Sequence, residues 1–191
     1  MKETEIELQA KVERTEPLTA FLKEKGAFQY ETRQIDEYFT PAHRDFLAVR
    51  PVEEWLRLRD SGGAYSLNYK RWHFDKTGRG LYADEFETKI ENLAMAKKAF
   101  AAINMKPLVT VGKARKVWTY GDYEISMDSV KDLGDFVEVE YMGKRSSTEH
   151  KEIIAEMVQF LKKLGCGKLE VNHGGYPALL LFGREGKFEV L

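Results

Sequence analysis

The chain has little cysteine, little proline and no excess charge of either sign. Its 191 residues include one cysteine, Cys166, with 5 prolines and 4 histidines. A single thiol cannot form a disulfide within the chain, and the cysteine and histidines do not have the spacing of zinc ligands. Lys and Arg number 30 and Asp and Glu 31, so the chain lacks the positive charge from which duplex-DNA binders gain much of their affinity. We expect no nucleic-acid partner.

Long hydrophobic runs and the common phosphate-binding motifs are also missing. The first residues are acidic, and no run approaches the roughly 18 apolar residues of a membrane helix. We therefore expect a cytoplasmic protein with no membrane partner. The glycines form no Walker loop, and no kinase motif is present. A chain of this length buries roughly 70% of its unfolded surface as one domain, and we predict a single domain over residues 1–191.

The hydrophobic pattern predicts a mixture of helices and many short strands. Helical spacing covers about residues 15–25 and 90–103, and a third stripe, 153–164, follows a capping-box pattern at 146–149. Alternation of polar and apolar residues predicts strands, several of them separated by turn residues. These segments are 5–13, 55–59, 65–72, 82–88, 109–118, 123–128 and 136–142. The pattern favours an antiparallel α+β domain.

The polar faces of these strands carry charges grouped by sign. Acidic pairs two residues apart occupy the first and last strands, and basic pairs lie between them. The pairs are Glu5 with Glu7, Arg57 with Arg59, Lys113 with Arg115, and Glu138 with Glu140. Alternation alone shows only that the two faces of a strand differ. The faces could be solvated, or the strands could close into a barrel with the charges inside. Solvent exposure gives no reason for the grouping by sign.

A metal–polyphosphate ligand does explain the grouping. A triphosphate carries about four negative charges near neutral pH, and its transfer reactions depend on positioning and on cations. Arg binds phosphate oxygens in pairs and Lys acts as a point charge. Mg²⁺ or Mn²⁺ takes oxygen ligands, typically one or two carboxylates together with phosphates and water. A cavity that holds several basic and several acidic side chains therefore suits this ligand.

Six motifs occur in one order along most of the chain, and together they resemble a known family. The motifs are Glu5-Ile6-Glu7, Asp36 to Phe39, Leu56-Arg57-Leu58-Arg59, Lys70, Lys113-Ala114-Arg115, and Asp128 with residues 133–140. They are similar to the signature of the CYTH domains, also called triphosphate tunnel metalloenzymes. The similarity is greatest to the class IV adenylyl cyclases, whose Y-x-x-L-L ending resembles residues 176–180.

The resemblance implies an eight-stranded antiparallel β-barrel with flanking helices, whose lumen binds a triphosphate together with Mg²⁺ or Mn²⁺. Three groups of residues follow from it by position. The metal ligands would be Glu5, Glu7, Asp128, Glu138 and Glu140. The substrate-binding residues would be Arg57, Arg59, Lys70, Lys113 and Arg115, with Glu87 lining the lumen. The catalytic residues would be Lys11, Lys70 and Arg115.

The chain departs from the family's signature at a few positions. Gln9 stands where the signature has Lys, and Lys11 lies on the same strand face, about 6.6 Å further along, from where it could reach the phosphates. Glu85 stands where many relatives carry a basic residue, and Gly174 and Gly175 precede Tyr176 where cyclases often have Arg and Ser. The sequence favours cyclisation of ATP to cyclic AMP and pyrophosphate. It leaves open an inorganic or thiamine triphosphatase, a non-catalytic triphosphate binder, and assembly as a homodimer.

Overall fold

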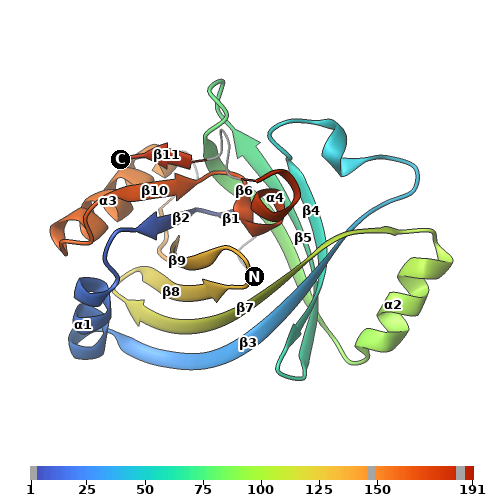
Figure 1. Ribbon diagram of the computed structural model, residues 1–191, viewed down its shortest axis with the longest axis horizontal. Coiled ribbons are helices and arrows are strands. Elements are labelled where there is room, and N and C mark those ends of the chain that lie inside the picture. Colours follow the sequence, from blue (N-terminus) through green and yellow to red (C-terminus); the bar gives the residue numbers. More distant parts are fainter. Residues whose placement is uncertain (1–3, 146–148, 184–187) are drawn as a thin grey trace.

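The computed structural model of the chain describes residues 4–145, 149–183 and 188–191. They form one strongly curved sheet with helices around it, and all of its described strand pairs are antiparallel (Figure 1). The strands are β1 (Thr4–Glu5), β2 (Glu7–Val12), β3 (Ala27–Thr40), β4 (Glu54–Ser61), β5 (Ala64–Phe74), β6 (Gly80–Ile90), β7 (Lys106–Tyr120), β8 (Tyr123–Val130), β9 (Gly134–Tyr141), β10 (Leu169–Asn172) and β11 (Phe188–Val190). The helices are α1 (Glu16–Lys25), α2 (Leu93–Ala102), α3 (His150–Lys163) and α4 (Gly175–Phe182).

The sheet surrounds a tunnel without closing in one continuous ladder. Its strand order is β1-β6-β5-β4-β3-β7-β8-β9-β2-β10-β11. The first two strands are parts of one N-terminal segment interrupted at Ile6, and they pair with β6 and β9 respectively. Ile6 still accepts a backbone hydrogen bond of 2.9 Å from Tyr141 N–H. Counted as one strand, this segment completes the eight predicted strands around the tunnel, and β10 and β11 extend the sheet beyond it.

The apolar faces of the strands point outward and are covered by helices. Leu8 and Ala10 of β2 belong to a buried cluster that also contains Leu22 of α1 and Met157 and Leu161 of α3. Burying a side chain of this size contributes about 1.5–3 kcal/mol. The hydrophobic stripe predicted for the third helix is therefore the face that packs on the sheet, while the capping-box residues 146–148 lie outside the described part of the chain. The polar faces are left to point inward.

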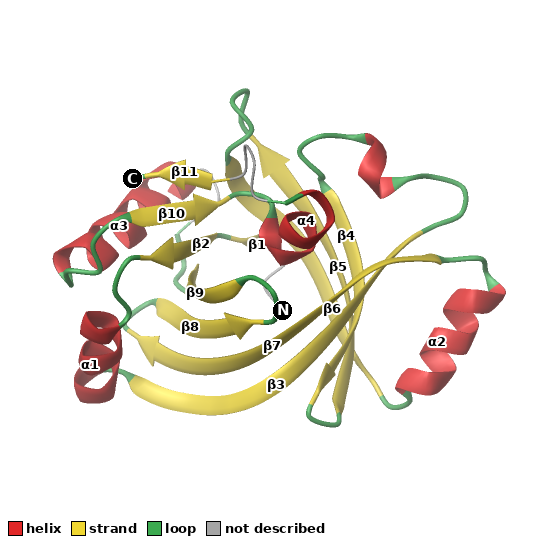
Figure 2. Cartoon of the chain, in the orientation of Figure 1, coloured by secondary structure: helices red, strands yellow, loops and turns green. Residues whose placement is uncertain are grey.

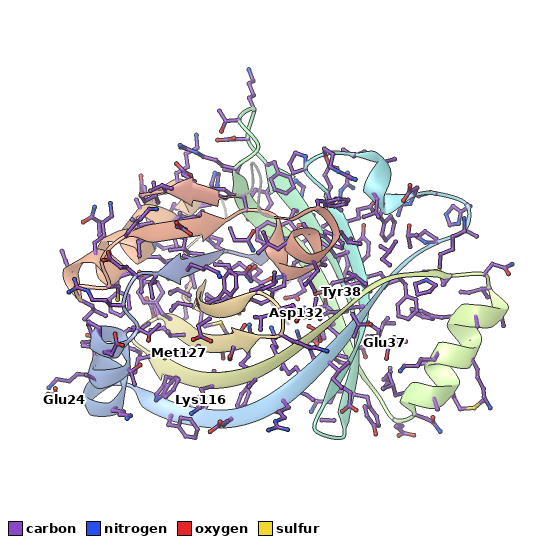
Figure 3. All side chains as sticks on the ribbon, in the orientation of Figure 1. Glu24, Glu37, Tyr38, Lys116, Met127 and Asp132 are labelled. Carbon is purple, nitrogen blue, oxygen red and sulfur yellow. The ribbon has the colours of Figure 1, made fainter. Side chains whose placement is uncertain are left out.

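Alternation along β3 places consecutive side chains on opposite sides of the sheet. Tyr38 is 6% exposed and belongs to a second apolar cluster with Trp55, whereas its neighbour Glu37 forms an ion pair with Lys97 of α2. Both residues are labelled in Figure 3. The same cluster contains Tyr176 and other residues of α4, so this short helix packs against the strands that bear the inward charges.

Helix α2 lies within the predicted range of 90–103 but does not bury its apolar face, and four other elements were not predicted. None of the ten residues of α2 is buried, and Figure 2 shows the helix standing away from the curved sheet. The periodicity did not predict β3, β10, β11 or α4. Strand β3 lacks a strict alternation because its first half is largely exposed, and α4 is apolar all round. No helix in the described residues has both the length and the apolar character that a membrane crossing needs.

Candidate active site

The inward faces of the strands line a cavity of about 200 Å³. Its charged lining consists of five basic and seven acidic side chains. The basic residues are Arg57, Arg59, Lys70, Lys113 and Arg115, and the acidic residues are Glu5, Glu7, Glu85, Glu87, Glu124, Glu138 and Glu140. Every predicted substrate-binding residue therefore lines this cavity, as do four of the five predicted metal ligands. The barrel-like arrangement with charged side chains inside is confirmed, although the sheet is not closed and aromatic residues share the cavity lining.

Asp36 holds two arginines at one wall of the cavity. It is 1% exposed, and its two carboxylate oxygens accept hydrogen bonds from Arg59 Nε at 2.6 Å and Arg59 Nη2 at 2.8 Å. Arg57 Nη1 lies 3.7 Å from the same carboxylate. Burial disfavours the charged form of Asp36, but the two arginines outweigh this effect and hold the pKa of Asp36 well below its usual range. Asp36 is thus a buried anion beneath two cavity cations.

Asp128 plays the same part at a second wall, and its role as a metal ligand stays a prediction. It is 2% exposed and does not line the cavity. Arg115 donates to both of its oxygens, at 2.7 and 2.6 Å, and Lys113 Nζ lies 3.3 Å away. The hydroxyl of Tyr176 donates to Oδ2 at 2.8 Å. Both oxygens accept hydrogen bonds from protein donors, so Asp128 holds Lys113 and Arg115 in place.

Lys70 lies among the acidic residues of β1, β2 and β6. Its Nζ is 2.5 Å from Glu5, 3.3 Å from Glu7 and 3.9 Å from Glu85. Burial and the neighbouring Glu7 raise the pKa of Glu5, against the opposing effect of Lys70. Burial and Glu7, which lies directly opposite on the paired strand, likewise raise the pKa of Glu140 to about 8. Glu85 has a second cation, because Arg57 Nη2 lies 3.9 Å from it. The other acidic residues of this group, which we call the Lys70 cluster (Glu5, Glu7, Glu85 and Glu140), share the one ammonium group and are incompletely neutralised.

Glu138 is a fully compensated anion, unlike the Lys70 cluster. Arg115 Nη2 donates to its Oε1 at 2.8 Å, and Gln9 Nε2 donates to its Oε2 at 2.9 Å. Burial opposes ionisation, but Arg115 and Lys113 outweigh it, so that the pKa of Glu138 lies well below its usual range. Lys113 shows the converse effect, because burial and the nearby Arg115 lower its pKa to about 8. Gln9, which replaces the signature Lys, here supplies a neutral hydrogen bond to the acidic wall.

Two of the predicted residues are less central than expected. Lys11 does not line the cavity: its Nζ donates to the carbonyl of Leu133 at 2.5 Å and lies 4.8 Å from the centre of the Phe136 ring. Lys11 thus points away from the cavity, and its contact with the phosphates stays a prediction. Glu87 is exposed and accepts a hydrogen bond from Ser66, which places it at the rim.

Several site residues escaped a role in the sequence analysis. Asp36 and Tyr176 lay inside recognised motifs, but nothing in the sequence indicated that they would bond to cavity cations. Glu124 lines the cavity, and burial raises its pKa. Five aromatic side chains also line it, and alternation could not distinguish them from core. They are Tyr30, Tyr38, Trp55, Trp72 and Tyr176.

Three buried polar atoms of cavity-lining side chains lack a hydrogen-bond partner among the described residues. Arg57 Nε is a donor, and Gln34 Oε1 and Glu5 Oε2 are acceptors, although Glu5 Oε2 forms an ion pair with Lys70. Leaving a buried polar group without a hydrogen bond costs about 1–3 kcal/mol. Because native proteins pair most such groups, the unpaired Arg57 donor points to a ligand with acceptor oxygens.

The donor set fits a divalent metal that binds together with phosphate. Within the described residues, no three His, Cys, Asp or Glu side chains form a ready-made metal-binding group. Mg²⁺, however, commonly uses only one or two carboxylates and takes its remaining ligands from substrate phosphates and water. Glu5, Glu7 and Glu140, which line the cavity, can supply such carboxylates.

Comparison with known proteins agrees with this combination of a tunnel fold and a charged lumen. Residues 3–176 match the CYTH domain. A protein from Methanocaldococcus jannaschii named "Putative adenylate cyclase MJ0240" is 30% identical over 176 residues, 92% of this chain and 97% of that protein. The structure of the PH1819 protein from Pyrococcus horikoshii OT3 has a TM-score of 0.76 at 25% identity, covering 94% of this chain and 99% of that one.

A third relative shares the fold at lower identity. The structure of HpAC1 from Hippeastrum, whose description reports a dominant triphosphatase activity, has a TM-score of 0.63 at 18% identity, covering 97% of this chain and 96% of that one. The fold and site therefore define a triphosphate tunnel protein. The chain belongs to the CYTH domain family. This family comprises proteins that act on triphosphates and generally use divalent metal ions.

Proposed function

We propose that this protein is a metal-dependent phosphoryl-transfer enzyme that converts ATP to cyclic AMP and pyrophosphate in its tunnel. The observation that carries the proposal is one cavity that holds cations anchored by buried Asp36 and Asp128 together with the incompletely neutralised Glu5, Glu7 and Glu140. The cations suit phosphate oxygens and the carboxylates suit a divalent cation. The full-length similarity to the M. jannaschii protein favours cyclisation among the reactions of triphosphates.

The anchored cations would bind and orient the triphosphate. Arg57, Arg59, Lys113 and Arg115 would hold phosphate oxygens, and their buried partners would keep each side chain in place before the substrate arrives. This preorganisation matters because phosphoryl transfer is catalysed mainly by positioning and electrostatic stabilisation. Arg57 Nε is the donor best placed to gain a partner on binding, since it has none among the described residues.

The acidic wall would hold the metal. Glu5, Glu7 and Glu140 would be its ligands, with Glu138 beside them. Bound Mg²⁺ or Mn²⁺ would lower the pKa of the ribose 3′ hydroxyl and offset the charge that develops on the phosphates. The 3′ oxygen then forms a bond to the α-phosphorus as the bond to the pyrophosphate oxygen breaks, and the hydroxyl proton is released. Lys70 and Arg115 would stabilise the negative charge on the phosphates during this step.

A triphosphatase is the second candidate, in which water replaces the ribose hydroxyl as nucleophile. It is favoured by the fold shared with HpAC1, whose description reports such an activity. The aromatic lining argues for a substrate with an aromatic ring, such as ATP, over inorganic triphosphate, because a ring can stack on aromatic side chains such as the partly exposed Trp72.

Incubation with ATP and Mn²⁺ distinguishes these activities. We expect cyclic AMP and pyrophosphate in equal amounts. Release of orthophosphate would instead support the triphosphatase, and repetition with tripolyphosphate would show whether the nucleoside is needed. Retention of ATP without turnover would indicate a non-catalytic binder and would contradict the proposed reaction. An Arg33→Ala variant serves as the active control, because it is altered on the exposed face of β3, outside the site.

A further inference from the structure

The end of β10, at Asn172, is linked to Glu138 in the cavity lining through the side-chain amides of Asn172 and Gln9. Asn172 Nδ2 donates to Gln9 Oε1 at 2.5 Å, and Gln9 Nε2 donates to Glu138 Oε2 at 2.9 Å. At the other end, the backbone N–H of Gly174 donates to Asn172 Oδ1 at 3.1 Å. Asn172 and Gln9 are 6% and 7% exposed, and Asn172 does not line the cavity.

These hydrogen bonds have a fixed direction. A carboxylate only accepts hydrogen bonds, so Gln9 must present its NH₂ group to Glu138 and its carbonyl oxygen to Asn172. Asn172 must then present its own NH₂ group to Gln9, and its oxygen is left to accept from Gly174. Each amide therefore determines the orientation of the other, and neither can flip without placing two donors or two acceptors face to face.

A second route leads from Tyr176 to the other oxygen of Glu138. Tyr176 donates to Asp128 at 2.8 Å, Arg115 donates to Asp128 at 2.6 Å, and Arg115 donates to Glu138 Oε1 at 2.8 Å. The two oxygens of Glu138 are thus held by separate hydrogen-bonded chains, and both chains end between Asn172 and Tyr176. A lysine at position 9 could donate to Glu138 but could not accept from Asn172.

We propose that Gln9 and Asn172 form a matched amide pair that positions Glu138, so that Asn172, which never touches the cavity, is a positioning residue for the triphosphate site. The pair explains how this chain accommodates a neutral side chain where the signature has lysine. It also gives residues 172–176 a direct connection to the site through two independent hydrogen-bonded chains. This inference rests on the proposed function, because the site is taken to bind a metal–triphosphate.

The first test removes the Asn172 amide without changing any charge. We expect Asn172→Ala to weaken the affinity for tripolyphosphate with Mn²⁺, measured by calorimetry, about fivefold, the equivalent of one neutral hydrogen bond. A purely structural role would lower the unfolding midpoint and leave this affinity unchanged. That outcome would overturn the positioning role. A wild-type protein that binds neither tripolyphosphate nor ATP with Mn²⁺ would overturn the proposed function itself, together with the role built on it.

The second test exchanges the amide pair for an ion pair. Gln9→Lys and Asn172→Asp should each lower the unfolding midpoint and weaken binding, because each leaves a mismatched group in the chain of hydrogen bonds. Together they should restore both properties, with an affinity within about threefold of wild type, since the new ammonium and carboxylate groups can pair. The control combines Asn172→Asp with Gln159→Lys on the exposed face of α3, which has the same net charge.

The control should not be rescued, because its added lysine lies on the exposed face of α3 and not at position 9, which bonds to residue 172. A Gln9→Lys and Asn172→Asp double variant no better than the sum of its single effects would overturn the matched pair, even if the protein binds and turns over its substrate. If the control recovers stability and binding to the same extent, the rescue is due to net charge, and this result would also overturn the matched pair.

Discussion

Buried aspartates outside the cavity determine where its cations lie. Asp36 contacts Arg57 and Arg59, and Asp128 contacts Lys113 and Arg115. Removing one partner of a buried pair leaves an uncompensated charge, which is more costly than the pair itself is stabilising. Each aspartate is therefore expected to affect both the stability of the fold and the geometry of the site.

Asp36→Asn should destabilise the protein at pH 7 by about 3–5 kcal/mol, because both arginines lose their buried anion. The folded-state pKa of Asp36 lies below its unfolded value of about 3.9. Its contribution is therefore fully present above pH 3.9 and is lost as the pH falls toward the folded pKa. The difference between wild type and variant should shrink by about 1 kcal/mol from pH 7 to pH 3.

Urea unfolding at the two pH values measures this effect. Asp135→Asn, a change at an exposed position on β9, should change stability by less than about 0.5 kcal/mol at both. A difference between wild type and Asp36→Asn that grows on acidification would contradict the assigned role of Asp36.

Arg57 is the cation with an unpaired buried donor, and we expect Arg57→Ala to weaken tripolyphosphate binding by about 1.5–3 kcal/mol through loss of a charge-assisted hydrogen bond. Calorimetry in the presence of Mn²⁺ measures the change, with Arg33→Ala on the outer face of β3 as the matched control. Equal affinity in the two variants would remove Arg57 from the phosphate-binding wall.

Replacement by glutamine should affect the stability of the protein differently at Glu140 and at Glu138. Glu140 faces Glu7 and belongs to a crowded acidic cluster, so Glu140→Gln should leave metal-free stability unchanged or higher while abolishing Mn²⁺-dependent turnover. Glu138 is bonded to Arg115 and Gln9, so Glu138→Gln should destabilise the protein by about 1.5–3 kcal/mol. Thermal unfolding measures the stability of the two variants, and a turnover assay measures their activity. Retained Mn²⁺-dependent turnover in Glu140→Gln would exclude Glu140 as a metal ligand.

At the scale of elements, the helices contribute unequally to the fold. Leu161 of α3 is fully buried under the sheet, so Leu161→Ala should cost about 2–5 kcal/mol. Leu93 belongs to α2, which buries none of its residues, and Leu93→Ala should cost less than about 1.5 kcal/mol. Chemical denaturation compares the two. Equal losses would show that α2 packs more closely than this structure indicates.

Element prediction succeeded where one face of the chain is buried and failed where it is not. The strict alternation of residues 5–13 predicted the N-terminal segment, because Leu8 and Ala10 pack beneath helices while Glu7 and Gln9 face the cavity. Strand β3 escaped prediction because much of it is exposed on both faces. The alternation of residues 5–13 gave no sign of the interruption at Ile6, by which one segment pairs with both β6 and β9.

Site prediction had a similar limit. Pairs two residues apart correctly identified the charged lining, since a strand sends such residues to one side. The pattern could not separate a residue that faces the cavity from one that lies behind it, as with Asp128, nor show that Lys11 runs past the end of the cavity. Those distinctions depend on the tilt of the strands and on α4, which are properties of the assembled sheet.

At the scale of the whole molecule, the fold is an inside-out sheet whose helices cover its apolar outer face. The tunnel can gather seven carboxylates and five cations because aspartates buried behind the lining hold most of those cations in place. The acidic side chains of the lining outnumber the basic ones, so a triphosphate should enter together with metal cations rather than alone.

The most direct test is crystallography of the protein with Mn²⁺ and tripolyphosphate, using anomalous scattering to locate the metal. We expect manganese beside Glu5, Glu7 and Glu140, with phosphate oxygens on Arg57 and Arg115; manganese and phosphate bound only outside the tunnel would contradict the account.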